Sequence, residues 1–195
     1  HTASSYAIQT LKEEIDLPIV GVVEPGAKSA VRMTKNYKVG VIGTEGTIGS
    51  GSYQNCIKLI EPKIEVYARP CPLFVPLVEE GWTEGEVPFL IAKEYLCPLI
   101  SKGIDVLLLG CTHYPLLIPT ISKIAPTIEL VDSAKETAEE VYSILKSHNL
   151  LRENIDTTIE SVKYYVTDNP EKFIKIGKRV LGSDIDNIEW VDLEP

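Results

Sequence analysis

Apolar residues recur along the chain in short uninterrupted runs that are separated by longer stretches with helical spacing. Runs of four to eight residues rich in Val, Ile and Leu are typical of buried strands. The predicted strands are IVGVV (19–23), YKVGVI (37–42), IEVYA (64–68), IDVLLL (104–109), TIELV (127–131), SVKYYVT (161–167) and IEWVDL (188–193). The predicted helices cover about 1–15, 26–35, 74–80, 85–101, 133–147 and 170–181, with a further helix carrying Tyr53, Ile57 and Ile60 and a short one after Pro115.

The alternation of apolar strands with helices predicts an α/β fold whose parallel sheets are covered by helices on both faces. In such folds ligands bind at the carboxyl ends of the strands. The residues that follow IVGVV, YKVGVI and IDVLLL are therefore the first candidates for chemistry.

The composition of the chain limits the classes of partner that we expect it to bind. The chain has 195 residues, 28 acidic against 19 basic side chains and a formal charge of -9, which disfavours nucleic acid and anionic membrane surfaces as partners. No apolar run approaches the roughly 20 residues that span a bilayer, and no basic segment followed by an apolar stretch opens the chain. We therefore expect a cytoplasmic protein.

The four cysteines, at 56, 71, 97 and 111, form no CxxC pair, and only Cys111 has a histidine close by in sequence, His113. This spacing suggests neither a zinc site nor a dense disulfide framework. We expect reduced thiols and no metal.

Cys111 is the strongest candidate for chemistry. It follows Gly110 at the end of IDVLLL, and Pro115 is well placed near the start of the next helix. Free N–H groups and the positive end of a helix dipole stabilise a thiolate. In an extended segment His113 projects to the same side as Cys111, and Thr112 adds a hydroxyl donor. The alternative is that Cys111 is a buried small apolar residue and His113 a structural histidine.

Other interpretations stay open at this point. The loop GTEGTIGSG (43–51) lacks both GxGxxG and GK[ST], so its glycines fit a strand-to-helix turn or a carboxylate site better than a nucleotide site. Cys111 and His113 could instead be the nucleophile and base of an acyl-transfer enzyme. A third possibility is a ligand-binding protein without catalysis.

The segment GCTHYP (110–115), placed after an apolar strand, resembles the second active-site signature of glutamate racemases, which belong to the cofactor-independent Asp/Glu racemase family. The segments HTASSYA, VVEPG, VGVIGT, CPLFVPLVEEG and LVDSA are similar to family segments in the same order, so the resemblance covers the whole chain. Two departures stand out. His1 occupies a position where the family usually has asparagine, and the family's opening Asp-Ser-Gly-x-Gly-Gly segment and first cysteine are absent from the printed sequence.

The resemblance implies that the protein interconverts L- and D-glutamate with two thiols, without a cofactor or metal, and supplies D-glutamate for peptidoglycan synthesis. Aspartate is the alternative substrate. One thiol would be Cys111, and the other would be the residue before His1, in an N-terminal portion that we expect to be missing from the printed chain. Each thiol would alternate between base and acid.

The resemblance also assigns roles to further residues. Thr2, Thr112 and His113 match positions that bind the substrate, and Thr44 and Thr47 match hydroxyls near its carboxylate. Glu79 corresponds to an acidic position that would orient or charge His113. His1 would contribute through its backbone or its ring.

The implied architecture has two α/β lobes with the site in the cleft between them. Residues 27–138 would form a continuous lobe, and residues 1–26 and 139–195 would belong to the other. Family behaviour implies a homodimer or a similar assembly.

Overall fold

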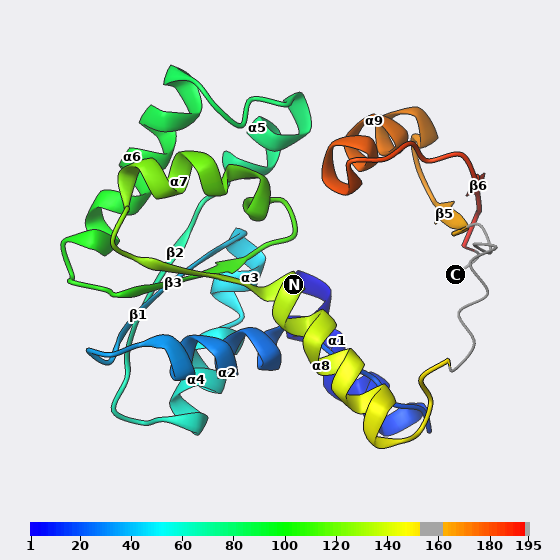
Figure 1. The fold of residues 1–195 in the computed structure, drawn as a ribbon, viewed down its shortest axis with the longest axis horizontal. Helices are drawn as coiled ribbons and strands as arrows, with labels where there is room; N and C mark the ends of the chain where they lie inside the picture. The colour runs from blue at the N-terminus through cyan, green and yellow to red at the C-terminus, as the bar shows by residue number, and fades with distance from the viewer. Residues whose placement is uncertain (153–161, 194–195) are drawn as a thin grey trace. The chain divides into compact units, whose positions relative to one another are not determined.

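The computed structural model describes residues 1–152 and 162–193. The chain divides into two compact units, 1–150 and 151–195, which are considered separately (Figure 1). The strands of the first unit are β1 (Lys38–Gly43), β2 (Glu65–Pro70), β3 (Val106–Gly110) and β4 (Glu129–Asp132). Its helices are α1 (Thr2–Glu14), α2 (Val23–Met33), α3 (Glu45–Gly49), α4 (Ser52–Ile60), α5 (Phe74–Glu80), α6 (Glu86–Ile100), the 3-10 helix η1 (Tyr114–Leu117), α7 (Ile118–Ile124) and α8 (Ser133–Ser147).

The strands of the first unit form one parallel sheet in the order β2-β1-β3-β4. Its two central strands are almost entirely buried, as their apolar sequences require. In the register of the sheet Gly43 lies opposite Gly110, so β1 and β3 end side by side. The loops after these two strands therefore start from the same edge of the sheet.

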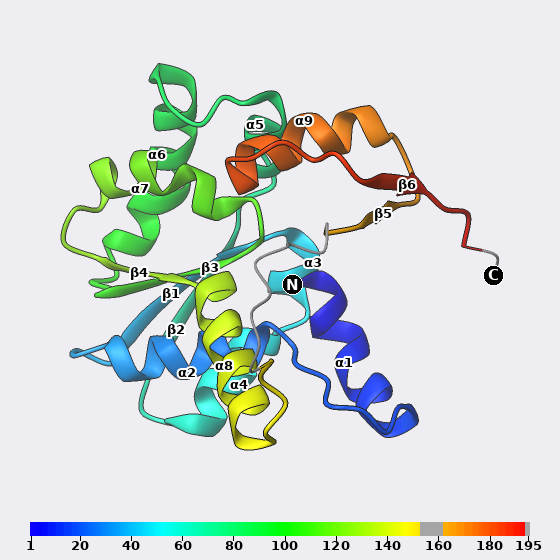
Figure 2. The ribbon, with the colours of Figure 1, turned by 45° about the vertical axis from the view of Figure 1, so that its right-hand side comes forward.

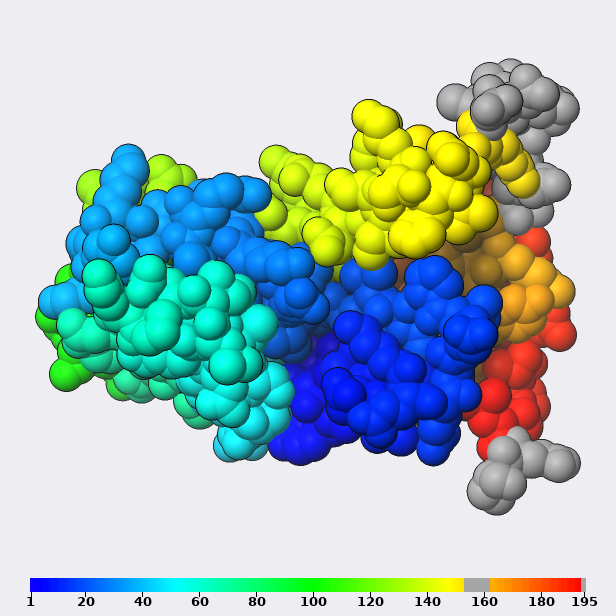
Figure 3. All heavy atoms as spheres, turned by 90° about the horizontal axis from the view of Figure 1, so that it is seen from below, coloured from blue at the N-terminus to red at the C-terminus, as the bar shows by residue number. Residues whose placement is uncertain are grey.

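Helices cover both faces of this sheet, with α5, α6 and α7 on one face and α2 and α4 on the other (Figures 1 and 2). Side chains of β1 and β3 alternate between the two apolar clusters, because successive side chains of a strand point to opposite faces. The space-filling view in Figure 3 shows α2, α4, α1 and α8 on one face of the unit. Helix α1 also contacts α3, which brings the start of the chain to the carboxyl edge of the sheet.

The second unit contains β5 (Tyr164–Val166), α9 (Pro170–Leu181) and β6 (Ile188–Trp190). Strands β5 and β6 pair in parallel, and α9 forms the helical crossover connection that two parallel strands require. The side chain of Asn169 caps α9 by accepting a hydrogen bond from the Lys172 N–H at 3.0 Å. These elements match the strand-helix-strand pattern predicted for the end of the chain.

The structure confirms the α/β class, and the predicted helices are present within a few residues of their expected bounds. The predicted strand at 19–23 is wrong. Helix α2 already begins at Val23, and within the described residues no strand pairs with this segment, which packs on α1 through Gly21 and Ile8. A strand needs a hydrogen-bonded neighbour, which apolar composition alone does not supply. Part of the predicted strand at 161–167 lies outside the described residues, since the structure describes this region only from 162 onward.

None of the described helices combines the length and the apolar character that a membrane span requires.

Candidate active site

Cys111 directly follows β3 and is buried, with 6% of its surface exposed. The preceding Gly110 has no room for a side chain, because a Cβ there would lie 2.8 Å from the carbonyl oxygen of Ile42 and 3.1 Å from the ring of Tyr53. Residues 111–113 turn away from the sheet, and η1 begins at Tyr114. The thiol therefore lies at the carboxyl edge of the sheet and at the start of a helical turn, as predicted.

Cys111, His113 and Glu79 form a continuous series of contacts. The Sγ of Cys111 lies 3.8 Å from Nδ1 of His113, and the Thr112 Oγ1 lies 3.4 Å from the same nitrogen. On the far side of the ring, Nε2 of His113 lies 3.6 Å from Oε1 of Glu79 on α5, and both side chains are 27% exposed. The imidazole thus lies between a thiol and a carboxylate, which is the arrangement that orients a histidine.

Burial raises the pKa of the Cys111 thiol above its ordinary value. The backbone N–H groups of His113 and Tyr114 and the hydroxyl of Thr112 act in the opposite direction, as expected for a thiol at a helical turn. Burial outweighs them, so the pKa stays above its ordinary value. The expected interactions that favour the thiolate are therefore present, but burial has the larger effect on the pKa. Cys111 is accordingly a neutral thiol at neutral pH.

Three hydroxyl groups, those of Thr2, Thr44 and Thr47, lie together in the pocket that Cys111 lines, and we call them the threonine cluster. Thr2 Oγ1 lies 3.1 Å from Thr44 Oγ1 and 3.2 Å from Thr47 Oγ1, and the last two oxygens are 3.0 Å apart. Thr44 is also the N-cap of α3 and accepts a hydrogen bond from the Thr47 N–H at 3.2 Å. The cluster brings together residues that are 45 positions apart in sequence.

His1 lies at the N-cap of α1 with both ring nitrogens in hydrogen-bond contact. Its Nδ1 lies 2.8 Å from the Tyr53 hydroxyl, and its Nε2 lies 3.2 Å from the Ser133 hydroxyl. Tyr53 and Ser133 are both buried. Sequence reasoning assigned neither residue to the site, although Ser133 belongs to the LVDSA segment that was used for the resemblance.

One pocket, with a volume of about 320 Å³, collects the predicted binding residues. Its lining consists of His1, Thr2, Ala3, Thr44, Thr47, Val75, Cys111, Thr112 and His113. Glu79 is not part of the lining, and it contacts His113, which is. The volume falls within the range of small-molecule sites, and the wall carries several hydroxyl groups, two imidazoles and a single thiol.

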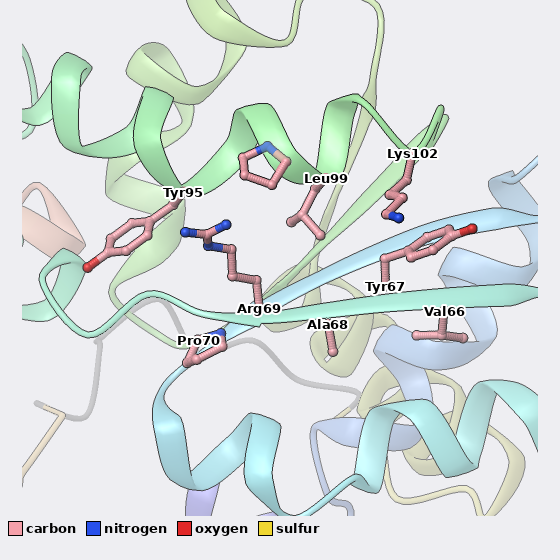
Figure 4. Close-up of a pocket in the computed structure, with 9 residues that line it drawn as sticks. Val66, Tyr67, Ala68, Arg69, Pro70, Tyr95, Leu99 and Lys102 are labelled. Atoms are coloured by element: carbon pink, nitrogen blue, oxygen red, sulfur yellow. The ribbon is translucent and has the colours of Figure 1, made fainter.

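A second groove, of about 630 Å³, runs along the edge strand β2 and is drawn in Figure 4. Its wall contains no thiol, imidazole or carboxylate. The Arg69 guanidinium lies 5.7 Å from the ring centre of Tyr95, and Lys102 Nζ lies 5.8 Å from that of Tyr67. A cationic side chain such as Arg69 on an edge strand disfavours pairing with other chains, and the lining of this groove offers no group for acid–base or nucleophilic catalysis.

Among the described residues, no three His, Cys, Asp or Glu side chains are grouped in a way that could hold a metal ion.

Comparisons with known proteins find relatives of similar sequence and similar fold. The family model described as Asp/Glu/Hydantoin racemase matches residues 2–141. The glutamate racemase of Geobacter metallireducens is 48% identical over 195 residues, which cover all of this chain and 72% of that protein. The crystal structure of glutamate racemase from Francisella tularensis in complex with D-glutamate has a TM-score of 0.89 and 35% identity, and covers 98% of this chain and 70% of that one. The RacE1 isoform of glutamate racemase from Bacillus anthracis has a TM-score of 0.91 and 35% identity, covering 98% and 71%.

Proposed function

Because this chain belongs to the Asp/Glu/hydantoin racemase family, we propose that the protein interconverts L- and D-glutamate by moving the Cα proton with thiol groups. The observation that carries the proposal is the buried thiol of Cys111 in a pocket that the threonine cluster also lines. A carboxylate bound to these hydroxyls leaves the rest of an amino acid facing the sulfur. The product would serve peptidoglycan synthesis.

Inversion at Cα requires a base on one face of the carbon and an acid on the other. Cys111 serves one face, removing the proton as a thiolate in one direction and donating it as a thiol in the other. His113 stabilises the thiolate or donates to a bound carboxylate, and Glu79 orients its ring, as the 3.8 Å and 3.6 Å contacts support. The high pKa of the free thiol suits an acid, and substrate binding must favour the thiolate for the reverse role.

The second thiol is assigned from sequence similarity. HTASSYA resembles the family segment Cys-Asn-Thr-Ala-Ser, with His1 at the asparagine position. We propose that a cysteine precedes His1 in the encoded protein and acts on the face opposite Cys111. Sequencing the coding region upstream of His1 tests this assignment, and any other codon at that position would remove it.

Substrate binding is assigned to Thr2, Thr44, Thr47, Thr112 and His113. Buried substrate charges need hydrogen-bond partners, and these side chains, with the N–H groups at the start of α3, provide them. His1 lines the same pocket. Residues 1–3, which we assign to the lobe of 1–26 and 139–195, line this pocket together with residues that follow β1 and β3 in the proposed lobe 27–138.

We propose glutamate rather than aspartate as the substrate, because relatives that are 48% and 47% identical to this chain are named glutamate racemases. We further propose a cytoplasmic location, in keeping with the expected reduced thiols, and a homodimeric assembly, in keeping with the family. The two alternatives are an acyl-transfer enzyme and a ligand-binding protein without catalysis. Either would account for the thiol and the imidazole, but neither would account for the match to the racemase family.

The experiment is a circular dichroism time course of L-glutamate and of D-glutamate with the complete gene product. We expect the signal of either enantiomer to decay toward zero and the Cys111→Ser variant to lose this decay. Cys97→Ser, at an exposed helical position, is the matched control and should retain turnover. Persistent racemisation by Cys111→Ser would contradict the role of this thiol, and no turnover by the wild type would contradict the proposed function.

A further inference from the structure

The ring of His1 is held by two hydroxyl groups that are themselves buried. Tyr53 on α4 has no exposed surface, and Ser133 at the start of α8 is 1% exposed. A buried hydroxyl without a partner costs free energy, so these contacts stabilise the two residues as well as the ring. His1 therefore joins α1 to two helices of the first unit.

The donor–acceptor distances indicate which atom of each hydrogen bond carries the hydrogen. The Ser133 hydroxyl donates to the Leu109 carbonyl at 2.9 Å, which is shorter than its 3.2 Å contact with Nε2 of His1. Since a serine hydroxyl has a single hydrogen, Nε2 must be the donor to Ser133 Oγ. In a neutral ring Nδ1 is then an acceptor, and Tyr53 donates to it at 2.8 Å in preference to the Val22 carbonyl at 3.4 Å.

The result is one directed chain of hydrogen bonds, Tyr53 to His1 to Ser133 to the Leu109 carbonyl. Leu109 lies on β3 two residues before Cys111, and His1 lies directly before Thr2 of the threonine cluster. The chain thus connects the backbone on both sides of the pocket. With both ring nitrogens engaged, the ring has no free polar atom for a substrate.

We propose that His1 is a positioning residue whose ring fixes the start of α1 against the end of β3, and so sets the placement of Thr2 relative to Cys111 across the pocket. This inference rests on the proposed function and refines it. The ring is withdrawn from direct substrate contact, and only the backbone of His1 stays available to the substrate. Tyr53 and Ser133 act through His1.

The kinetic test uses Tyr53→Phe and Ser133→Ala in the complete gene product. Each removes one hydroxyl and should raise the KM for glutamate roughly tenfold, because a displaced Thr2 binds the carboxylate less well. The double variant should be hardly worse than either single one, since Tyr53 and Ser133 contact the same ring and also each other. Ser29→Ala removes a serine that is also 1% exposed but is bonded to Met33 and Arg32, and it should leave KM unchanged.

A second readout does not depend on activity. His1 should show an exchange-protected Nε2 proton in NMR spectra in water, identified by its loss in His1→Asn, and this signal should also be lost in Ser133→Ala. An unchanged KM in both single variants would overturn the positioning role, and so would the absence of the protected proton in the wild type. If the wild type shows no turnover, the proposed function fails, and the proton signal still decides whether the ring is held.

Discussion

Cys111 and His113 lie two residues apart with Sγ 3.8 Å from Nδ1, although the thiol is buried and the ring is partly exposed. This contact joins the most buried reactive group of the pocket to a side chain that reaches the surface. Burial raises the pKa of the thiol, and the backbone N–H of His113 is the largest of the interactions that lower it.

The raised pKa of Cys111 predicts slow alkylation of the unliganded protein at neutral pH. The thiol is protonated below its pKa, and only the thiolate reacts, so the rate should rise with pH and reach half its maximum above the ordinary value of 9.0. Mass spectrometry of the iodoacetamide-modified Cys111 peptide across a pH series measures this. A midpoint well below neutral pH would show that the N–H groups outweigh burial.

Glu79→Gln tests the orientation of His113. The substitution keeps the shape of the side chain but removes its charge from a position 3.6 Å from Nε2. We expect kcat/KM for glutamate to fall roughly tenfold, because a less well oriented imidazole supports the thiolate poorly. Glu84→Gln, which breaks an exposed ion pair with Lys123 at 2.9 Å, is the control and should have wild-type kinetics. Equal kinetics for both variants would assign Glu79 no part in the reaction.

Thr47→Val tests the threonine cluster. The valine has a similar volume but lacks the hydroxyl that contacts Thr2 at 3.2 Å and Thr44 at 3.0 Å. Loss of one hydrogen bond to a charged carboxylate costs about 1.5–3 kcal/mol, so KM should rise roughly tenfold or more. Thr120→Val, at a buried threonine that donates to the Thr83 carbonyl away from the pocket, should alter stability but not KM. The opposite ranking of the two KM values would contradict the assignment.

Gly110→Ala tests the approach of β3 to its neighbours. The added Cβ would lie 2.8 Å from the Ile42 carbonyl oxygen, a contact that requires the strand end to move. We expect unfolding to become easier by about 1–3 kcal/mol and activity to fall, since Cys111 is the next residue. Gly49→Ala, at a helical glycine with open space around its Cβ position, should be neutral or stabilising. Denaturant unfolding of both variants compares them directly.

The local spacing of hydrophobic residues was sufficient to predict most of the helices and strands. The apolar run IDVLLL and the amphipathic stretch 133–147 were assigned correctly because their burial follows from their own spacing. The run IVGVV has the same composition as a strand and is not one, since pairing depends on a neighbour that the run itself does not specify. The short helix α3 was expected to be a loop because its glycines obscure the helical pattern.

The site was predictable only in part, because some of its contacts join residues that are far apart in the sequence. The residue types at Cys111 and His113 have a recognisable local context, and the threonines were assigned through the resemblance. Tyr53 and Ser133 reach His1 from positions 52 and 132 residues away, and no periodicity or motif links them. Their role emerges only when the hydrogen bonds of buried hydroxyls are followed through the fold.

Solvent deuterium incorporation at Cα of glutamate tests the central claim most directly, because a thiol that returns a proton carries a solvent-derived hydrogen. In D₂O the complete protein should introduce deuterium into the enantiomer it forms, and Cys111→Ser should not form the opposite enantiomer. Inversion without deuterium in the wild type, or inversion that survives in Cys111→Ser, would contradict proton transfer by the thiol of Cys111.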